Sequence, residues 1–276
     1  MPLIATGSIS KMKAKLETPV HYHLPVGEQL VDMNALLGQQ IRLVFTGKIF
    51  CQHCGRATSK SFSQGYCYPC MTTLAQCDSC IMSPEKCHFA QGTCREPEWG
   101  QSHCMIDHYV YLANASGIKV GITRTSQVPT RWIDQGAVQA LPILRVSSRY
   151  LSGLAEVLFK TQVSDKTNWR KMLKNEVEAL DLAQARDQLF NQLENEFKSF
   201  VQTQESDAVQ FLEAAESVNI DYPVLEYPQK VSSFNLDKDP QVAGELRGIK
   251  GQYLIFSEGV INLRKYTGYQ LEVYTE

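Results

Sequence analysis

Alternating apolar and polar positions near both ends of the chain favour β-strands there. Residues 40–45 alternate in part and end at the turn signal Thr46-Gly47. Residues 251–273 have the pattern of a strand meander with turns at residues 257–259 and 267–268. At each end of the chain a Gly-Gln pair precedes an apolar triplet. This short similarity is consistent with both ends supplying strands to one barrel or sheet.

The middle of the chain mixes short strand and helix patterns. Two apolar runs, residues 109–113 and 118–122, flank the tetrapeptide NASG, which is typical of a hairpin with a glycine-containing loop. Helical patterns follow over residues 130–135 and 152–160, and residues 141–146 between them favour a strand.

Residues 171–217 form the longest stretch with helical periodicity, and a break near residues 202–206 divides it in two. One apolar stripe runs along it, made of Val177, Leu180, Leu189, Leu193, Phe197 and Phe200. Such a stripe indicates packing against a core or, alternatively, the seam of a dimer.

Charge is unevenly distributed although the net charge of the 276 residues is only −2. Residues 107–175 carry ten lysines and arginines against four acidic residues, whereas residues 176–216 carry ten acidic residues against Arg186 and Lys198. The basic part predicts a polyanion-binding surface, and the alternative is chance with solvated faces.

No stretch approaches the roughly 20 apolar residues that a membrane helix needs, so we expect no membrane association. The opening residues, MPLIATGSISKMKAKLE, lack the apolar run of a signal peptide, which favours the cytoplasm.

All nine cysteines fall between Cys51 and Cys104. The first four have the spacing Cys51-x2-Cys54-x12-Cys67-x2-Cys70, in which each C-x-x-C turn offers two thiolates to one ion. Because thiols stay reduced in the cytoplasm, this spacing predicts a structural Zn2+ site rather than disulfides.

The remaining cysteines predict a second Zn2+ site. Cys77-x2-Cys80-x6-Cys87-x6-Cys94 would complete four ligands, with Cys104, His88 and His103 as alternates. The alternative is that some of these cysteines are small buried apolar residues. Sites made only of thiolates are normally closed, so both ions would be structural rather than catalytic.

Residues 108–137, with the sequence HYVYLANASGIKVGITRTSQVPTRWIDQGA, resemble the GIY-YIG superfamily, whose nuclease members cut nucleic acid with one divalent metal. The family's first-strand tyrosine falls on Tyr111, and Lys119-Val120-Gly121 stands where the family has Tyr-Ile-Gly. The helical arginine of the family falls on Arg131, and its metal-binding glutamate falls on Glu156. The resemblance covers about 70 of the 276 residues.

The resemblance implies a phosphodiesterase site. Tyr111 would assist a water molecule, Arg131 would neutralise charge on phosphate, and Glu156 would hold Mg2+ or Mn2+. Two positions depart from the pattern: Lys119 replaces the second tyrosine, as in phage-type branches with Lys-Ile-Gly-x-Thr, and Gln135 replaces a frequent histidine. Altered chemistry and binding without cleavage therefore both stay open.

Each of these four residues also has an alternative, purely structural interpretation. In that interpretation Tyr111 is a core residue, Lys119 a surface residue at a strand edge, Arg131 a partner of Asp134, and Glu156 an exposed helix residue.

The string DKTNWRKML at residues 165–173 would extend a nucleic-acid surface, because it mixes an aromatic ring with cations. The candidate nucleic-acid-binding residues are Arg124, Lys166, Asn168, Trp169 and Arg170. The alternative is a helix start, with Asp165 or Thr167 as the cap and Trp169 as a packing anchor.

Most of the chain also resembles a bacterial family of unknown function that combines a zinc-ribbon region with this module, through the strings KVGITR, PTRWIDQGA and DKTNWRKML. We therefore expect an α+β protein that binds DNA or RNA, with or without cleavage; a protein adaptor is the third hypothesis. The expected parts are an N-terminal β region (1–50), a zinc-binding region (51–106), a GIY-YIG-like α/β core (107–175), an acidic helical segment (176–217) and a C-terminal β region (218–276).

Overall fold

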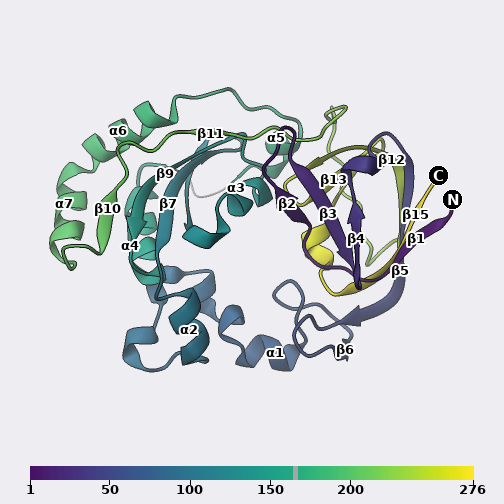
Figure 1. Ribbon diagram of the computed structural model, residues 1–276, viewed down its shortest axis with the longest axis horizontal. Coiled ribbons are helices and arrows are strands. Elements are labelled where there is room, and N and C mark those ends of the chain that lie inside the picture. Colours follow the sequence, from purple (N-terminus) through teal and green to yellow (C-terminus); the bar gives the residue numbers. More distant parts are fainter. Residues whose placement is uncertain (164–166) are drawn as a thin grey trace.

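A computed structural model describes residues 1–163 and 167–276 and has a mixed α+β fold with strands at both ends of the chain (Figure 1). The two ends meet in one sheet, in which the first strand pairs with the last. The order of this sheet is β1 (Leu3–Ser8), β15 (Tyr269–Thr275), β5 (Gln40–Phe50), β12 (Gln241–Lys250), β13 (Tyr253–Phe256) and β14 (Val260–Asn262), and β6 (Ala57–Thr58) pairs with β5. The expectation that both ends supply strands to one sheet is confirmed.

A smaller sheet of β2 (Lys13–Lys15), β3 (His21–Val26) and β4 (Gln29–Asp32) lies beside the large one, and its buried side chains belong to the same apolar core. The burial of β3 alternates from residue to residue, so one face of that strand is turned inward. The turn after β4 is the short helix η1 (Asn34–Leu36).

The predicted hairpin is present as β7 (His108–Asn114) and β8 (Ile118–Arg124). β7 is the central strand of an antiparallel sheet, because it also pairs with β9 (Gln139–Val146). The short strands β10 (Val209–Phe211) and β11 (Val218–Asn219) pair with β9. Tyr111 pairs with Gly121 across the hairpin, so its ring lies over a residue that has no side chain.

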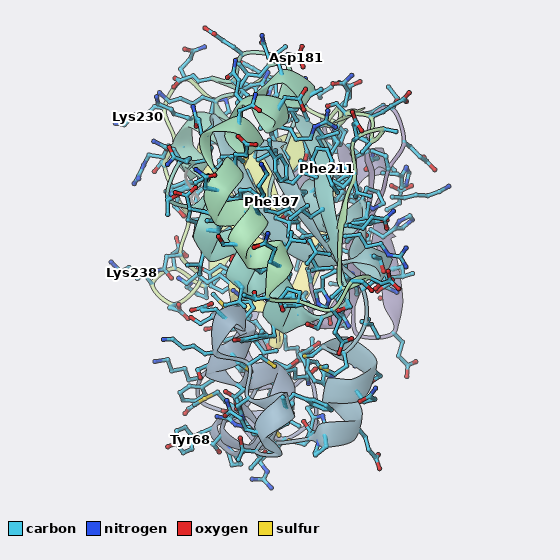
Figure 2. All side chains as sticks on the ribbon, turned by 90° about the vertical axis from the view of Figure 1, so that its left-hand side faces the viewer. Tyr68, Asp181, Phe197, Phe211, Lys230 and Lys238 are labelled. Carbon is cyan, nitrogen blue, oxygen red and sulfur yellow. The ribbon has the colours of Figure 1, made fainter. Side chains whose placement is uncertain are left out.

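Helices cover this sheet. The predicted helices are present as α3 (Thr130–Asp134) and α4 (Arg149–Phe159), and α5 (Trp169–Leu173) follows them. On the outer side, α6 (Leu182–Gln192) and α7 (Glu194–Gln202) pack with α4 on a second apolar core; Figure 2 faces these two helices. Phe159, Phe190 and Phe197 contact one another there. Most of the predicted apolar stripe is therefore used for packing.

The Cys-rich region lies between the two large sheets in sequence and has little regular structure. It consists of α1 (Tyr68–Thr73), η2 (Ala75–Cys77), η3 (Ser79–Ile81), η4 (Pro84–Lys86), η5 (Phe89–Gln91) and α2 (Pro97–His103). The short helices η6 (Thr125–Gln127) and η7 (Leu263–Tyr266) occur elsewhere in the chain. Apart from cysteines, the first half of the Cys-rich region buries Leu74 and Ala75 and little other apolar side chain.

Two expectations about element bounds are wrong. The strand from residue 40 does not end at Thr46-Gly47, because β5 continues to Phe50; Gly47 has φ +81° and lies where the pairing with β15 shifts register. The helical stretch does end at Gln202 as expected, but it is also interrupted at residues 174–181 and at Leu193, and residues 209–211 after the break form an edge strand instead of a second helix.

The structure gives the bounds of the elements, whereas the division of the chain into five parts stays a prediction. Within residues 1–163 and 167–276, no helix has the length and apolarity required to cross a bilayer.

Candidate metal centre and arginine-lined cavity

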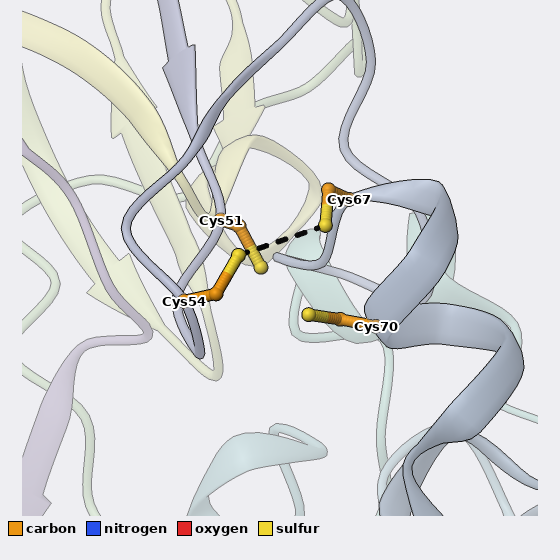
Figure 3. Close-up of side chains that lie close together, drawn as sticks. All are labelled: Cys51, Cys54, Cys67 and Cys70. Carbon is orange, nitrogen blue, oxygen red and sulfur yellow. Dashed lines mark hydrogen bonds between the residues drawn. The ribbon is translucent and has the colours of Figure 1, made fainter.

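The first four cysteines converge on one point, as Figure 3 shows. The Sγ atoms of Cys51, Cys54, Cys67 and Cys70 all lie within 4.8 Å of one another, and those of Cys54 and Cys67 are 3.8 Å apart. In a tetrahedral shell with metal–sulfur bonds of about 2.3 Å, neighbouring sulfurs are about 3.8 Å apart. The four thiols therefore fit a tetrahedral metal site.

Local structure explains why these side chains converge. Cys51 directly follows β5, and the backbone turns back at once, because Gly55 N–H donates to the carbonyl of Cys51. Cys67 and Cys70 are one helical turn apart at the start of α1, with Pro69 in its first turn. The small buried cluster here contains three of these cysteines and Leu74, so a bound metal would replace the missing apolar core.

The backbone also stabilises negative charge at this site. Burial raises the pKa of the Cys51 thiol, but backbone N–H groups of Cys54, Cys67 and His53 outweigh burial and lower it to about 6. Burial and the neighbouring thiols raise the pKa of Cys70. One thiolate is therefore favoured without a metal, and the other thiols would release their protons to solvent as their sulfurs bind a metal.

The later cysteines divide between two cavities. Cys80, Cys87 and Cys94 line a small cavity together with Cys104, one of the predicted alternates. Cys77 instead packs beside the first cluster and lines a larger cavity. Of the other two alternates, His88 lines the small cavity and His103 stacks on Trp99 with ring centroids 4.3 Å apart.

The larger cavity, of about 590 Å³, lies where the Cys-rich region meets the N-terminal and C-terminal strands and α3. Its cationic lining residues are Lys11, Arg131 and Arg264. Burial lowers the pKa of Arg264, and the like charge of Arg131 lowers it further. Two guanidinium groups that repel each other across a cavity form a site for an anion.

Neither arginine has a carboxylate partner within ion-pair distance among the described residues. The alternative pairing of Arg131 with Asp134 does not occur, because the Asp134 carboxylate accepts from Lys11 Nζ at 2.6 Å and from Gln252 Nε2 at 2.8 Å. Arg264 donates to the neutral side chain of Gln64 at 2.5 Å. Arg124 and Arg149 add positive charge nearby: burial lowers the pKa of Arg149, and Arg124 and Arg131 lower it further.

The four candidate catalytic residues are only partly brought together. Tyr111 is fully buried and donates to Gln135 Oε1 at 3.1 Å. Burial raises the pKa of Tyr111, Arg131 and Gln135 oppose this rise, and the negative charge of Glu156 adds to it. Glu156 binds Lys160 at 3.1 Å. Lys119 is buried, and its Nζ donates to Thr167 Oγ1 at 2.6 Å.

The candidate nucleic-acid-binding residues 168–170 serve local structure. Asn168 caps α5, because its Oδ1 accepts from the Lys171 N–H at 3.2 Å. Trp169 stacks on Tyr253 and carries the Arg170 guanidinium 4.4 Å above its ring. The packing-anchor interpretation thus describes Trp169, with Asn168 rather than Asp165 or Thr167 as the cap. Lys166 and Asp165 lie outside the described residues.

Arg264 is the residue that sequence reasoning missed. It lies 133 positions after Arg131 in the strand meander, where no motif marks it. It stands beside Lys265 in a segment that also carries Glu258 and Glu272, so its charge alone does not distinguish it.

These features define the class: an α+β protein with four converging thiols that could hold a metal ion, beside an arginine-lined cavity. The chain belongs to DUF2797, described as a protein of unknown function, whose family model matches residues 38–271. This span includes both groups of cysteines, Arg131 and Arg264. No curated protein and no solved structure matches the chain.

Proposed function

We propose that this protein is a zinc-stabilised nucleic-acid-binding protein that grips phosphate groups in the arginine-lined cavity. The observation that carries the proposal is the pair Arg131 and Arg264, which face one cavity without a carboxylate partner in the described part of the chain. Guanidinium groups bind phosphate oxygens in pairs of parallel hydrogen bonds. Among the described residues, Asp78 is the only acidic one that lines the cavity, and it is held by Arg95 at 2.6 Å.

Zinc is the metal that the first cluster would hold. Four soft thiolates in a tetrahedral arrangement select zinc over magnesium or calcium, which prefer oxygen ligands. The ion would stiffen the turn that carries Gln64 and Tyr66, two lining residues of the same cavity. Metal-binding thiolates of this kind require reduced cysteines, so the proposal places the protein in a reducing compartment such as the cytoplasm.

A divergent GIY-YIG-like core is part of this proposal. The order of β7, β8, α3, β9 and α4, with β7 at the centre of an antiparallel sheet, supports it. Arg131 on α3 and Glu156 on α4 both interact electrostatically with the buried Tyr111, which supports it further.

The test is binding to labelled single- and double-stranded DNA and RNA over a range of salt concentrations. We expect Arg131→Ala and Arg264→Ala each to weaken binding about tenfold and to reduce the slope of log affinity against log salt by about one. Arg247→Ala is the matched control, because Arg247 already pairs with Glu245 at 2.9 Å and lies outside this cavity. Binding that is equally strong in all three variants would contradict the proposal.

Cleavage of the bound strand is a second candidate function, favoured by the electrostatic interaction of the Tyr111 phenol with both Arg131 and Glu156. Glu156 would hold Mg2+ or Mn2+, and a water molecule would displace an oxygen of the phosphodiester. We expect cleavage that needs the metal and is lost in Glu156→Gln, while Glu194→Gln, an exposed pair with Lys198, retains it. Salt-sensitive binding without any cleavage would leave this protein a binder alone.

A further inference from the structure

Four cysteines outside the first cluster share a cavity of the size of an ion. Cys80, Cys87, Cys94 and Cys104 all line a cavity of about 10 Å³, and Cys77 does not. That volume is close to the space that one water molecule or metal ion occupies. Four thiols around so small a space form a donor set of the composition that a structural zinc site uses.

Two other candidate donors line the same cavity, and their side chains are already engaged. Asp78, Cys80 and His88 have ligand atoms within 4.8 Å of one another. The Asp78 carboxylate, however, binds Arg95 at 2.6 Å and accepts from Ser79 Oγ at 3.1 Å. His88 Nδ1 lies 2.8 Å from Thr93 Oγ1, and its Nε2 faces the Asp78 carboxylate at 3.6 Å.

Among the four thiols, that of Cys94 has a weak hydrogen-bond partner: its Sγ donates to the carbonyl of Glu96 at 3.5 Å. We propose that Cys80, Cys87, Cys94 and Cys104 together bind a second metal ion of the zinc type, each thiol releasing its proton to solvent as its sulfur binds the metal. This replaces the ligand set expected from spacing, since Cys104 takes the place of Cys77.

The backbone gathers these four side chains from separate turns. Cys80 lies within η3, Cys87 follows η4, Cys94 lies between η5 and α2, and Cys104 follows α2. Gly100 of α2 is essential to the arrangement, because an added Cβ there would lie 2.8 Å from the Phe89 ring and 3.1 Å from the Cys94 Sγ. Such short turns bury little apolar surface, so a metal would supply the crosslink that holds them together.

The same residues attach the Cys-rich region to α4. The Cys104 carbonyl accepts from the Arg149 N–H at 2.7 Å, and Arg149 Nη2 donates to the Ile81 carbonyl at 2.6 Å. Both contacts lie next to the proposed ligands, at the first residue of the helix that carries Glu156. The second ion would therefore fix the Cys-rich region against the sheet of β7, β8 and β9.

The experiment is metal analysis of the full-length protein, purified under reducing conditions and dialysed without chelator. We expect two zinc equivalents per chain in the wild type and one in each of Cys87→Ser and Cys104→Ser. His88→Gln should retain two, because the imidazole is not a ligand in this proposal. Cobalt in place of zinc should give the absorption of a four-thiolate tetrahedral site in Cys51→Ser/Cys54→Ser, where only the second site is left.

One equivalent in the wild type would overturn the proposal, and so would loss of the second equivalent in His88→Gln with its retention in Cys104→Ser. Alkylation of the native wild type, read by mass spectrometry, does not depend on any variant folding. We expect Cys77 to react at least tenfold faster than Cys80, Cys87, Cys94 and Cys104. Equal reaction of all five thiols would also overturn the proposal.

Discussion

The first cysteine cluster is held by two tight turns, whereas the later cysteines come together from four separate turns. In the first cluster, each C-x-x-C pair brings two thiols together by local backbone geometry, and only the approach of α1 to the end of β5 is left to tertiary structure. In the later group, Cys104 reaches the cavity after α2 and is anchored by Arg149 of another element. A metal site encoded by local turns depends on few distant contacts, and one assembled from distant turns depends on many.

The largest effect should come from removing the first cluster. Its apolar support is Leu74 and partly buried Tyr66, and structural zinc contributes on the order of 10 kcal/mol to the folding of small metal-bound units. We expect Cys54→Ser/Cys67→Ser to lose one zinc equivalent and to make residues 51–74 exchange amide hydrogens and cleave with protease like an unfolded segment.

Metal analysis, hydrogen exchange and limited proteolysis check this prediction. The strands of the large sheet serve as the internal control, because β5, β12 and β15 have a core of their own and should stay protected. Full metal content or native-like protection of residues 51–74 in the double variant would contradict it.

Acid should weaken the sheet next to the later cysteines through His108. This residue opens β7, is fully buried, and its Nε2 has no hydrogen-bond partner among the described residues. Burial lowers its pKa from 6.5 to about 4, so below pH 6.5 the unfolded chain takes up a proton that the native protein does not. Stability is therefore lost as pH falls from 6.5 towards 4, by up to about 3 kcal/mol.

Urea unfolding of wild type and His108→Gln at pH 7 and pH 5 measures this contribution. The variant should lose less stability than the wild type on acidification, whatever its stability at pH 7. Metal content at both pH values is the control, because protonation of ligand thiols would lower stability in both proteins alike. Equal losses of unfolding free energy in wild type and His108→Gln between pH 7 and pH 5 would show that His108 is not the cause.

Gly153→Ala tests whether the later group depends on docking to α4. An added Cβ would lie 2.4 Å from the Glu85 N and 2.6 Å from the Pro84 carbonyl carbon, so backbone would have to move. Alanine normally stabilises a helix relative to glycine by up to about 1 kcal/mol, but here the clash should cost about 2 kcal/mol net. We expect weaker binding of the second metal and unchanged binding of the first.

Chelator competition, which reports the affinity of each site separately, checks this result. Val157→Ala is the matched control on the same helix, since Val157 is 46% exposed and its truncation should change stability by less than about 0.5 kcal/mol. If Gly153→Ala weakens both metal sites equally, docking to α4 does not act on the second site alone, which contradicts the prediction.

Local signals predicted much of the fold and of the first cluster. The hairpin at residues 114–117, helices α3 and α4, and the turns of the C-terminal meander follow from patterns a few residues long, which the sequence displays directly. The α+β class with strands at both ends is confirmed as well. The four converging thiols follow from two C-x-x-C turns and need one long-range contact to be correct.

Features that depend on distant contacts could not be predicted in the same way. The end of β5 is set by its pairing with β15, more than 200 residues later. The local hydrophobic periodicity near Gly47 does not depend on that partner and so could not predict it. Arg264 joins Arg131 only because the C-terminal strands close against α3. Spacing favours Cys77 over Cys104 as a partner of Cys80, whereas in the structure Cys104 and not Cys77 lines the small cavity.

The smallest effect should come from Cys77→Ala. Cys77 lies in sequence between the first cysteine cluster and the four ligands proposed for the second metal, and this variant tests whether it belongs to the second set. Cys77 lines the larger cavity, and the only ligand set that includes it is the one inferred from spacing. Truncating a partly buried thiol should cost less than about 1 kcal/mol, and both zinc equivalents should remain. Zinc content and thermal unfolding of this variant, compared with Cys104→Ser, give the readout. Loss of the second equivalent in Cys77→Ala would restore the spacing-based ligand set, because a residue that only lines a cavity cannot remove a metal from the site beside it.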